Sequence, residues 1–118
     1  ENKFAFDNGV ITFDAWDCNR SMANVSQWLK SHTYKRDIYI SFDIDVYDIS
    51  YLPCTGTPEP FGLNPFQVLE LMNSISDTAR LVGLDFVETG LKNNDYREGT
   101  LATQTLLRIL SRSYMANL

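Results

Sequence analysis

The sequence predicts an α/β fold with three layers, α/β/α, in which helices cover both faces of a mainly parallel sheet. The first observation behind this prediction is that segments rich in β-branched and aromatic residues alternate along the chain with segments of helical periodicity. The second is that the strand-like segments are apolar on both sides, as in a parallel sheet covered on both faces. The 118 residues, 44% hydrophobic and 21% charged, have the length and composition of one globular domain, residues 1–118.

The first half of the chain is expected to contain two strands separated by a helix. Residues 10–14 (VITFD) form a short β-rich run after a turn signal, which predicts a strand. Residues 36–46 (RDIYISFDIDV) give the strongest strand prediction in the chain, because β-branched and aromatic residues dominate them. Between these strands, residues 21–32 have helical spacing, with apolar or aromatic side chains at Met22, Val25, Trp28, Leu29 and His32.

The second half predicts a helix, a strand and a final helix. Residues 64–67 (NPFQ) are a helix start, because the asparagine caps, the proline suits the first turn and the glutamine reaches back. Residues 80–88 (RLVGLDFVE) are a strand with a nearly continuous apolar interior. Asp95 followed by Glu98 can cap the last helix, whose expected apolar face is Leu101, Ala102, Leu106, Ile109 and Leu110. The predicted order is β-α-β-α-β-α.

Four acidic residues fall at the ends of the predicted strands: Asp14, Asp43, Asp45 and Glu88. Ligands of open α/β sheets bind beyond the carboxyl ends of the strands, so these residues are expected to share one edge. Asp43 and Asp45 are expected on the same side of one strand, about 6.6 Å apart. A divalent cation between two such carboxylates would remove their repulsion, which makes a metal site one interpretation. Two solvated aspartates making turn hydrogen bonds are the other.

The net charge and the cysteines limit the partners and the cellular location that can be expected for the protein. The formal net charge of −5 makes nucleic acid and anionic membranes unsuitable partners. No apolar run has the length of a membrane span, and no leader sequence is recognisable. Cys18 and Cys54 have no metal-ligand spacing, and two thiols without a disulfide are expected. These features favour a cytoplasmic protein.

Residues 41–63 (SFDIDVYDISYLPCTGTPEPFGL) resemble the ureohydrolase signature of the arginase and agmatinase family. Residues 83–88 (GLDFVE) are similar to the next strand of that family, which ends in a glutamate, and the resemblance extends over residues 36–112. Pro58-Glu59-Pro60 is more similar to agmatinases than to arginases. The positions of the first segment that match in unbroken register are Ser41, Asp43, Asp45, Asp48, Pro53, Thr55, Gly56, Thr57, Pro58, Gly62 and Leu63.

The resemblance implies an arginase-like α/β/α fold, present in part, and hydrolysis of an agmatine-like guanidino compound to urea and an amine. It implies two Mn²⁺ ions as cofactors and attack by a metal-bound hydroxide. Thr57 and Glu88 would bind the cationic substrate, and no residue is assigned as catalytic. A homo-oligomer, trimer or hexamer, is also implied. The metal ligands implied by the resemblance are Asp14, Asp17, Asp43 and Asp45.

The resemblance is incomplete in the N-terminal half. The family motif D-A-H-x-D is represented here by Asp14-Ala15-Trp16-Asp17, without the histidine, so Asp17 fits only if one residue has been deleted. One ion or none is therefore an alternative to two. His32 is either a recruited ligand or a helix-end residue. The alternative function is a relative without activity, a structural subunit or a polyamine-binding module, rather than a metal-dependent hydrolase.

Overall fold

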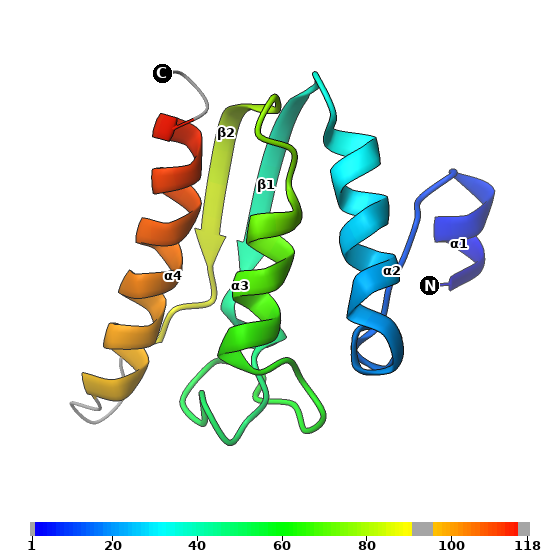
Figure 1. The fold of residues 1–118 in the computed structure, drawn as a ribbon. Coiled ribbons are helices and arrows are strands. Elements are labelled where there is room, and N and C mark those ends of the chain that lie inside the picture. Colours follow the sequence, from blue (N-terminus) through cyan, green and yellow to red (C-terminus); the bar gives the residue numbers. More distant parts are fainter. Residues whose placement is uncertain (1, 91–95, 116–118) are drawn as a thin grey trace.

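In a computed structural model of the protein, residues 2–90 and 96–115 are described. The elements are the helices α1 (Asn2–Asp7), α2 (Ala15–Thr33), α3 (Pro65–Ser74) and α4 (Tyr96–Met115), the strands β1 (Asp37–Asp43) and β2 (Arg80–Val87), and one turn of 3-10 helix, η1 (Ile44–Val46). In Figure 1, α3 lies in front of the strands, with α4 and α2 on either side, and α1 stands beyond α2.

The sheet of the described residues consists of β1 and β2, which are parallel and are connected through α3. Asp37 pairs with Arg80 at the start of the strands and Asp43 pairs with Val87 at their end. The Arg80 guanidinium also forms a two-pronged ion pair with the Asp37 carboxylate, which links the side chains of this first pair. Both carboxyl ends therefore lie at the same end of the molecule (Figure 1).

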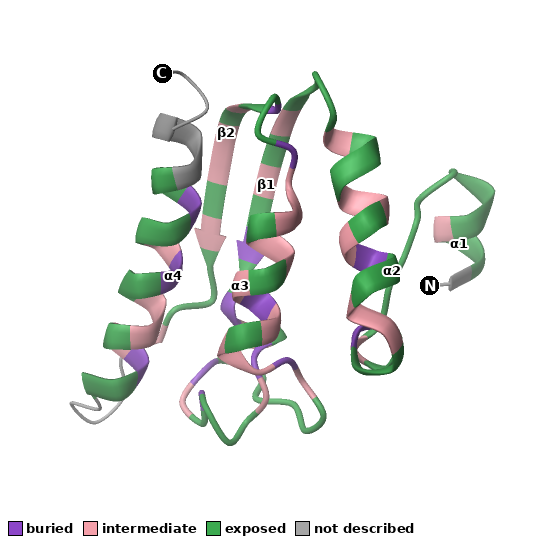
Figure 2. Cartoon of the chain, in the orientation of Figure 1, coloured by how far each residue is buried: buried purple, intermediate pink, exposed green. Residues whose placement is uncertain are grey.

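The core lies between the sheet and the helices α2, α3 and α4. Along β1, exposed residues alternate with covered ones, so one face of the sheet packs on the helices and the other is open. Figure 2 shows the buried positions on the helix side and around the loops below the strands. The core residues are Cys18, Val25, Phe42, Ile44, Tyr47, Leu52, Leu63, Val68 and Ile109.

The α/β class and the parallel sheet are confirmed. In the described part of the chain, helices cover one face, so two of the three expected layers are present. On the other face Tyr39 is 59% exposed and Val82 is 56% exposed, although the sequence predicted cover for both sides. Tyr39 and Val82, whose apolar character suggested a second covered face, lie on the open face of the sheet, where no described helix packs (Figure 1).

The predicted strand at 10–14 is wrong. These residues are neither helix nor strand, and Asp14 instead caps α2, which begins at Ala15 rather than near residue 21. The Asp14 carboxylate accepts a hydrogen bond from the Asp17 N–H at 2.8 Å, and the Asp17 carboxylate accepts one from the Asp14 N–H at 3.2 Å. This reciprocal cap satisfies two backbone donors locally, and it outweighs the β-rich composition of a segment that has no described strand beside it.

The start of α3 follows the sequence prediction. The Asn64 carboxamide accepts from the Gln67 N–H and the Gln67 carboxamide accepts from the Asn64 N–H, both at 2.9 Å, with Pro65 at the first helical position. At the start of α4, Glu98 is buried in the first turn, whereas Asp95 lies outside the described residues. On the predicted face of α4, Ile109 is buried and Leu110 is 45% exposed.

Replacing Asn64 with alanine is expected to lower the free energy of unfolding by about 1 kcal/mol, because α3 then loses its N-cap acceptor. Urea unfolding followed by circular dichroism measures the change. The matched control is Asn24→Ala, at an exposed position inside α2, where alanine is the better helix former and stability should not fall. Equal losses in both variants would contradict a capping role for Asn64.

Candidate functional site

The first part of the site lies where β1 ends. The strand ends at Asp43, and η1 begins at the next residue, Ile44, whose side chain is fully buried. The Asp43 carboxylate accepts a hydrogen bond from the Asp45 N–H at 3.0 Å. Asp43 and Asp45 are therefore joined by a turn. The sequence had predicted them as alternate residues of one strand, and this prediction is wrong. The turn is favoured because the aspartate satisfies a backbone donor that the end of the strand leaves open.

Asp45 is held by the loop that contains Thr55, Gly56 and Thr57. The Thr57 hydroxyl donates a hydrogen bond to Asp45 Oδ2. Burial acts to raise the pKa of the Asp45 carboxyl, but hydrogen bonding from Thr57 and the nearby polar side chain of Thr55 lower it, and the net pKa is below its ordinary value. The other oxygen, Oδ1, is buried and accepts no hydrogen bond from the described residues.

Replacing Thr57 with valine is expected to lower the free energy of unfolding by about 1 kcal/mol at pH 7. Because the folded-state pKa of Asp45 is depressed, its stabilisation is present above the unfolded-state pKa and is lost as the pH falls below about 4, through the folded-state pKa. The difference between wild type and variant should therefore shrink at pH 3. Urea unfolding at both pH values measures it, with Thr103→Val, exposed on α4, as the control. A pH-independent difference would contradict the ionic contribution.

The second part of the site lies where β2 ends. Glu88 directly follows Val87, the last residue of the strand, and has a backbone φ of 60°, in the left-handed region that residues with side chains seldom adopt. Its carboxylate approaches Gly56: a Cβ atom built on Gly56 would lie 2.8 Å from Glu88 Oε2. Gly56 thus contacts the residue after β2, while the next residue, Thr57, contacts the acidic turn after β1. One loop joins both strand ends.

Asp48 braces the chain between β1 and this loop. One of its carboxylate oxygens accepts from the Ser50 N–H at 2.9 Å and from the Ser50 hydroxyl, and the other accepts from the Gly62 N–H at 3.2 Å. The Ser50 hydroxyl is the largest cause of the lowered pKa of the Asp48 carboxyl. With its oxygens used in this way, Asp48 shapes the turn.

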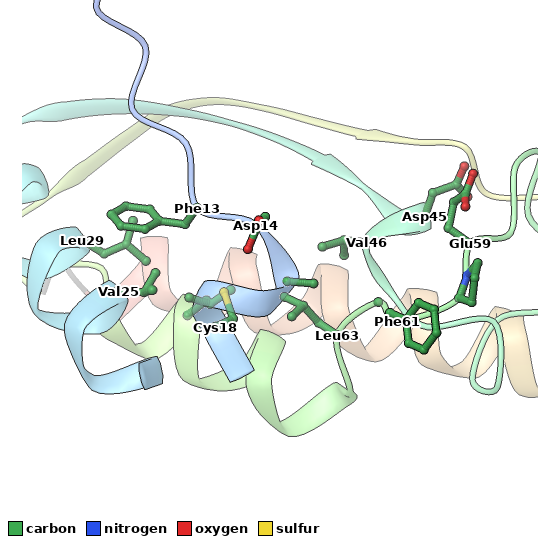
Figure 3. A pocket seen from close by; sticks show the side chains of 14 residues that line it. Phe13, Asp14, Cys18, Val25, Leu29, Asp45, Val46, Glu59, Phe61 and Leu63 are labelled. Atoms are coloured by element: carbon green, nitrogen blue, oxygen red, sulfur yellow. The ribbon is translucent and has the colours of Figure 1, made fainter. Parts of the chain in front are cut away.

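Asp14 and Asp17 lie at the start of α2. Their carboxylates are occupied by the helix cap described above. Asp14 nevertheless lines the same cavity as Asp45 and Glu59, a largely apolar space of about 470 Å³ between the start of α2, α3 and residues 59–63 (Figure 3). Glu59 is a polar lining residue that the sequence reasoning did not assign. The only sequence feature that marks Glu59 is the Pro58-Glu59-Pro60 run, which resembles agmatinases.

His32 is placed at the end of α2. Its ring stacks on Trp28, with 4.0 Å between the ring centres, and its Nδ1 lies 2.9 Å from the Trp28 carbonyl oxygen. Both contacts are within the helix, so the helix-end interpretation fits and recruitment as a ligand has no support. Cys18 and Cys54 do not form a disulfide, as expected. None of the described helices combines the length and apolar character needed to cross a membrane.

The described residues do not amount to a complete metal centre, because no three of their His, Cys, Asp and Glu side chains gather in a way that could hold an ion. Asp45 Oδ1 is one buried oxygen that a cation could use. Two carboxylates alone are fewer donors than either Mn²⁺ or Mg²⁺ takes from its surroundings, and they offer no imidazole. A two-manganese site does not fit the described residues on their own.

Fold and site together define an α/β protein whose polar groups meet at the carboxyl end of a parallel strand pair. A sequence profile described as "Arginase family" matches residues 1–110, and the chain belongs to this family. It is 33% identical over 105 residues to the agmatinase of Escherichia coli strain SE11, covering 88% of this chain and 34% of the relative. It is also 33% identical over 100 residues to an N(1)-aminopropylagmatine ureohydrolase of Thermus thermophilus, covering 85% and 33%.

Two solved structures give the same result for the fold. The proclavaminate amidino hydrolase of Streptomyces clavuligerus matches with a TM-score of 0.88 and 28% identity, over 98% of this chain and 39% of that one. The agmatine ureohydrolase of Thermoplasma volcanium matches with a TM-score of 0.69 and 29% identity, over 86% and 33%. The chain thus spans about a third of the length of the curated relatives that it matches. Its fold is a partial arginase-like α/β fold.

Proposed function

We propose that the protein acts in the hydrolysis of a guanidino compound of the agmatine class, giving urea and an amine. The observation that carries this proposal is the loop around Gly56, which brings Asp45 and Thr57 at the end of β1 together with Glu88 at the end of β2. The similarity to proteins named agmatinase and N(1)-aminopropylagmatine ureohydrolase supports this substrate class.

The chemistry of Glu88 and Thr57 suits a guanidinium group. The planar guanidinium presents parallel N–H donors, and a carboxylate such as that of Glu88 can accept two of them at once. The Thr57 hydroxyl already donates its hydrogen to Asp45, so its oxygen is left as an acceptor toward a ligand. Both groups therefore present acceptors to a molecule that carries only donors. This pairing orients the carbon of the guanidinium group for hydrolysis.

Asp43 and Asp45 are the residues that we propose for metal binding, with Asp14 and Asp17 as further predicted ligands. Mn²⁺ stays a prediction for this chain, because donors beyond the described residues are needed to complete a centre. Asp43→Asn is expected to lower Mn²⁺ affinity at least tenfold. An unchanged manganese titration in this variant would remove Asp43 from the ligand set.

Urea release tests the proposed activity. Agmatine, arginine and guanidinobutyrate are each incubated with the protein and added Mn²⁺, and urea is measured. We expect urea from agmatine in preference to arginine. No urea from any of the three, with manganese shown to be bound, would end the proposal of hydrolysis.

The second candidate is a relative without activity that binds polyamines or serves as a structural subunit. It is favoured by the absence of a three-ligand group among the described residues. Metal analysis separates the two candidates. Two manganese ions per chain would contradict the inactive relative, and a chain that binds no manganese would support it. A homo-oligomer, trimer or hexamer, is a proposal that rests on the family resemblance, and a cytoplasmic location is a proposal that rests on the sequence features given above. Sedimentation of the purified protein tests the oligomer.

A further inference from the structure

The backbone of Glu88 fixes the direction in which its side chain leaves the end of β2. With φ at 60°, the Cα–Cβ bond points differently from that of a residue continuing the strand. Such a conformation persists only where the surroundings determine it, and it is frequent at ligand sites. The question is which contact holds the exposed carboxylate of Glu88 in one place.

The Glu88 carboxylate lies beside Gly56, in the space where a side chain at position 56 would begin. A Cβ atom at position 56 would lie 2.8 Å from Oε2 and 4.0 Å from Cδ of Glu88, and among the described residues beyond its chain neighbours it would meet no other atom within 4 Å. A real Cβ essentially never lies 2.8 Å from a heavy atom of a residue elsewhere in the chain, so the carboxylate occupies the space that a side chain at 56 would fill. The absent side chain makes the close approach possible.

The glycine at 56 is not explained by its own backbone. Gly9 has φ of 68° and a Cβ there would meet no described atom within 4 Å, so Gly9 is needed for its conformation alone. Gly56 shows the opposite combination, a φ outside the left-handed region and a neighbour that is too close. Its loop is held by the bond from Thr57 to Asp45. A methyl group at 56 would therefore displace the flexible Glu88 side chain, and the loop would stay.

We propose that Gly56 is a positioning residue, which keeps the Glu88 carboxylate against the loop where a guanidinium ligand meets Glu88 and Thr57 together. This inference rests on the proposed function, since it concerns the same ligand. It predicts that stability and ligand affinity respond differently to a change at position 56. The variant Gly56→Ala should fold normally, because the end of a flexible side chain can yield, and it should bind the ligand poorly.

Calorimetric titration with agmatine, combined with thermal unfolding, tests the proposal. Gly56→Ala is expected to weaken agmatine binding at least tenfold, because a displaced Glu88 carboxylate loses at least one charge-assisted hydrogen bond to the guanidinium, which corresponds to a factor of roughly ten or more. Its melting temperature should stay at that of the wild type. In a Glu88→Ala background, the added Gly56→Ala change should have no further effect on binding, because the methyl group acts only through Glu88.

The outcomes are distinguishable. Unchanged agmatine affinity in Gly56→Ala, or an equal loss in the Glu88→Ala background, would overturn the positioning role. Should Gly56→Ala fail to fold, the double variant Gly56→Ala/Glu88→Ala should regain the wild-type melting temperature, and failure to regain it would overturn the contact. Absence of agmatine binding by the wild type would instead count against the proposed function, and the positioning role would fall with it because it concerns the same ligand.

Discussion

Replacing Glu88 with alanine is expected to weaken agmatine binding at least about 100-fold. The proposed contact is a pair of charge-assisted hydrogen bonds, each contributing about 1.5–3 kcal/mol, and every 1.4 kcal/mol corresponds to a factor of about ten. The side chain is exposed and follows the last residue of β2, so its removal should leave the melting temperature unchanged. Calorimetric titration with agmatine measures the affinity, and urea release measures the activity.

Glu70→Ala is the matched control for Glu88→Ala. Glu70 lies in α3, and among the described residues its side chain makes only a long 3.5 Å hydrogen bond, with Ser26, so the control removes the same charge away from the strand ends. We expect its agmatine affinity to equal that of the wild type. Similar losses in the two variants would mean that net charge, rather than the position of Glu88, attracts the ligand.

Truncating Ile44 to alanine is expected to lower the free energy of unfolding by about 3–4 kcal/mol. Ile44 is fully buried in the core, and the loss combines the transfer of the removed carbons with the cavity left behind. Because single domains are stable by only about 5–15 kcal/mol, this is a large fraction of the total. Ile44 also lies between Asp43 and Asp45, so the turn that shapes the acidic pair should loosen. Chemical denaturation monitored by fluorescence gives the free energy.

Ile49→Ala is the control for the core truncation, since Ile49 is 40% exposed in the same stretch of chain. The same carbons are removed from a position that is already partly in water, so the loss should stay below about 1 kcal/mol. Equal losses at the two positions would show that Ile44 is less important to the core than its burial indicates.

Much of the fold was predictable because short-range chemistry specifies it. The cap at Asn64 and Gln67 is complete within four residues, and the strands at 37–43 and 80–87 stand out by their β-branched and aromatic content. The segment 10–14 was not predictable in the same way. A β-rich run becomes a strand only beside another strand, and the local cap formed by Asp14 and Asp17 fixes its end as the start of a helix.

The sequence grouped Asp45 with Thr57 correctly, whereas the binding roles of the candidate site residues stay predictions and the geometry of the acidic turn was not foreseen. Asp45 and Thr57 stand in a recognisable motif, and they are hydrogen-bonded in the structure. The turn between Asp43 and Asp45 was not predicted, because two aspartates separated by one residue fit both an alternating strand and a hydrogen-bonded turn. The contact between Gly56 and Glu88 depends on a left-handed backbone at a glutamate, for which the sequence carries no signal.

The parallel pair formed by β1 and β2 has a consequence for self-association. In the described part of the chain the sheet has no central strand, so each strand has one outer row of amide and carbonyl groups that the other does not reach. Neither β1 nor β2 contains proline, and their only basic side chain, that of Arg80, lies at the very start of β2, so the usual protection against edge pairing is weak. Another β-segment could therefore extend this sheet without rearranging it, and we expect concentrated samples of the chain to form reversible oligomers.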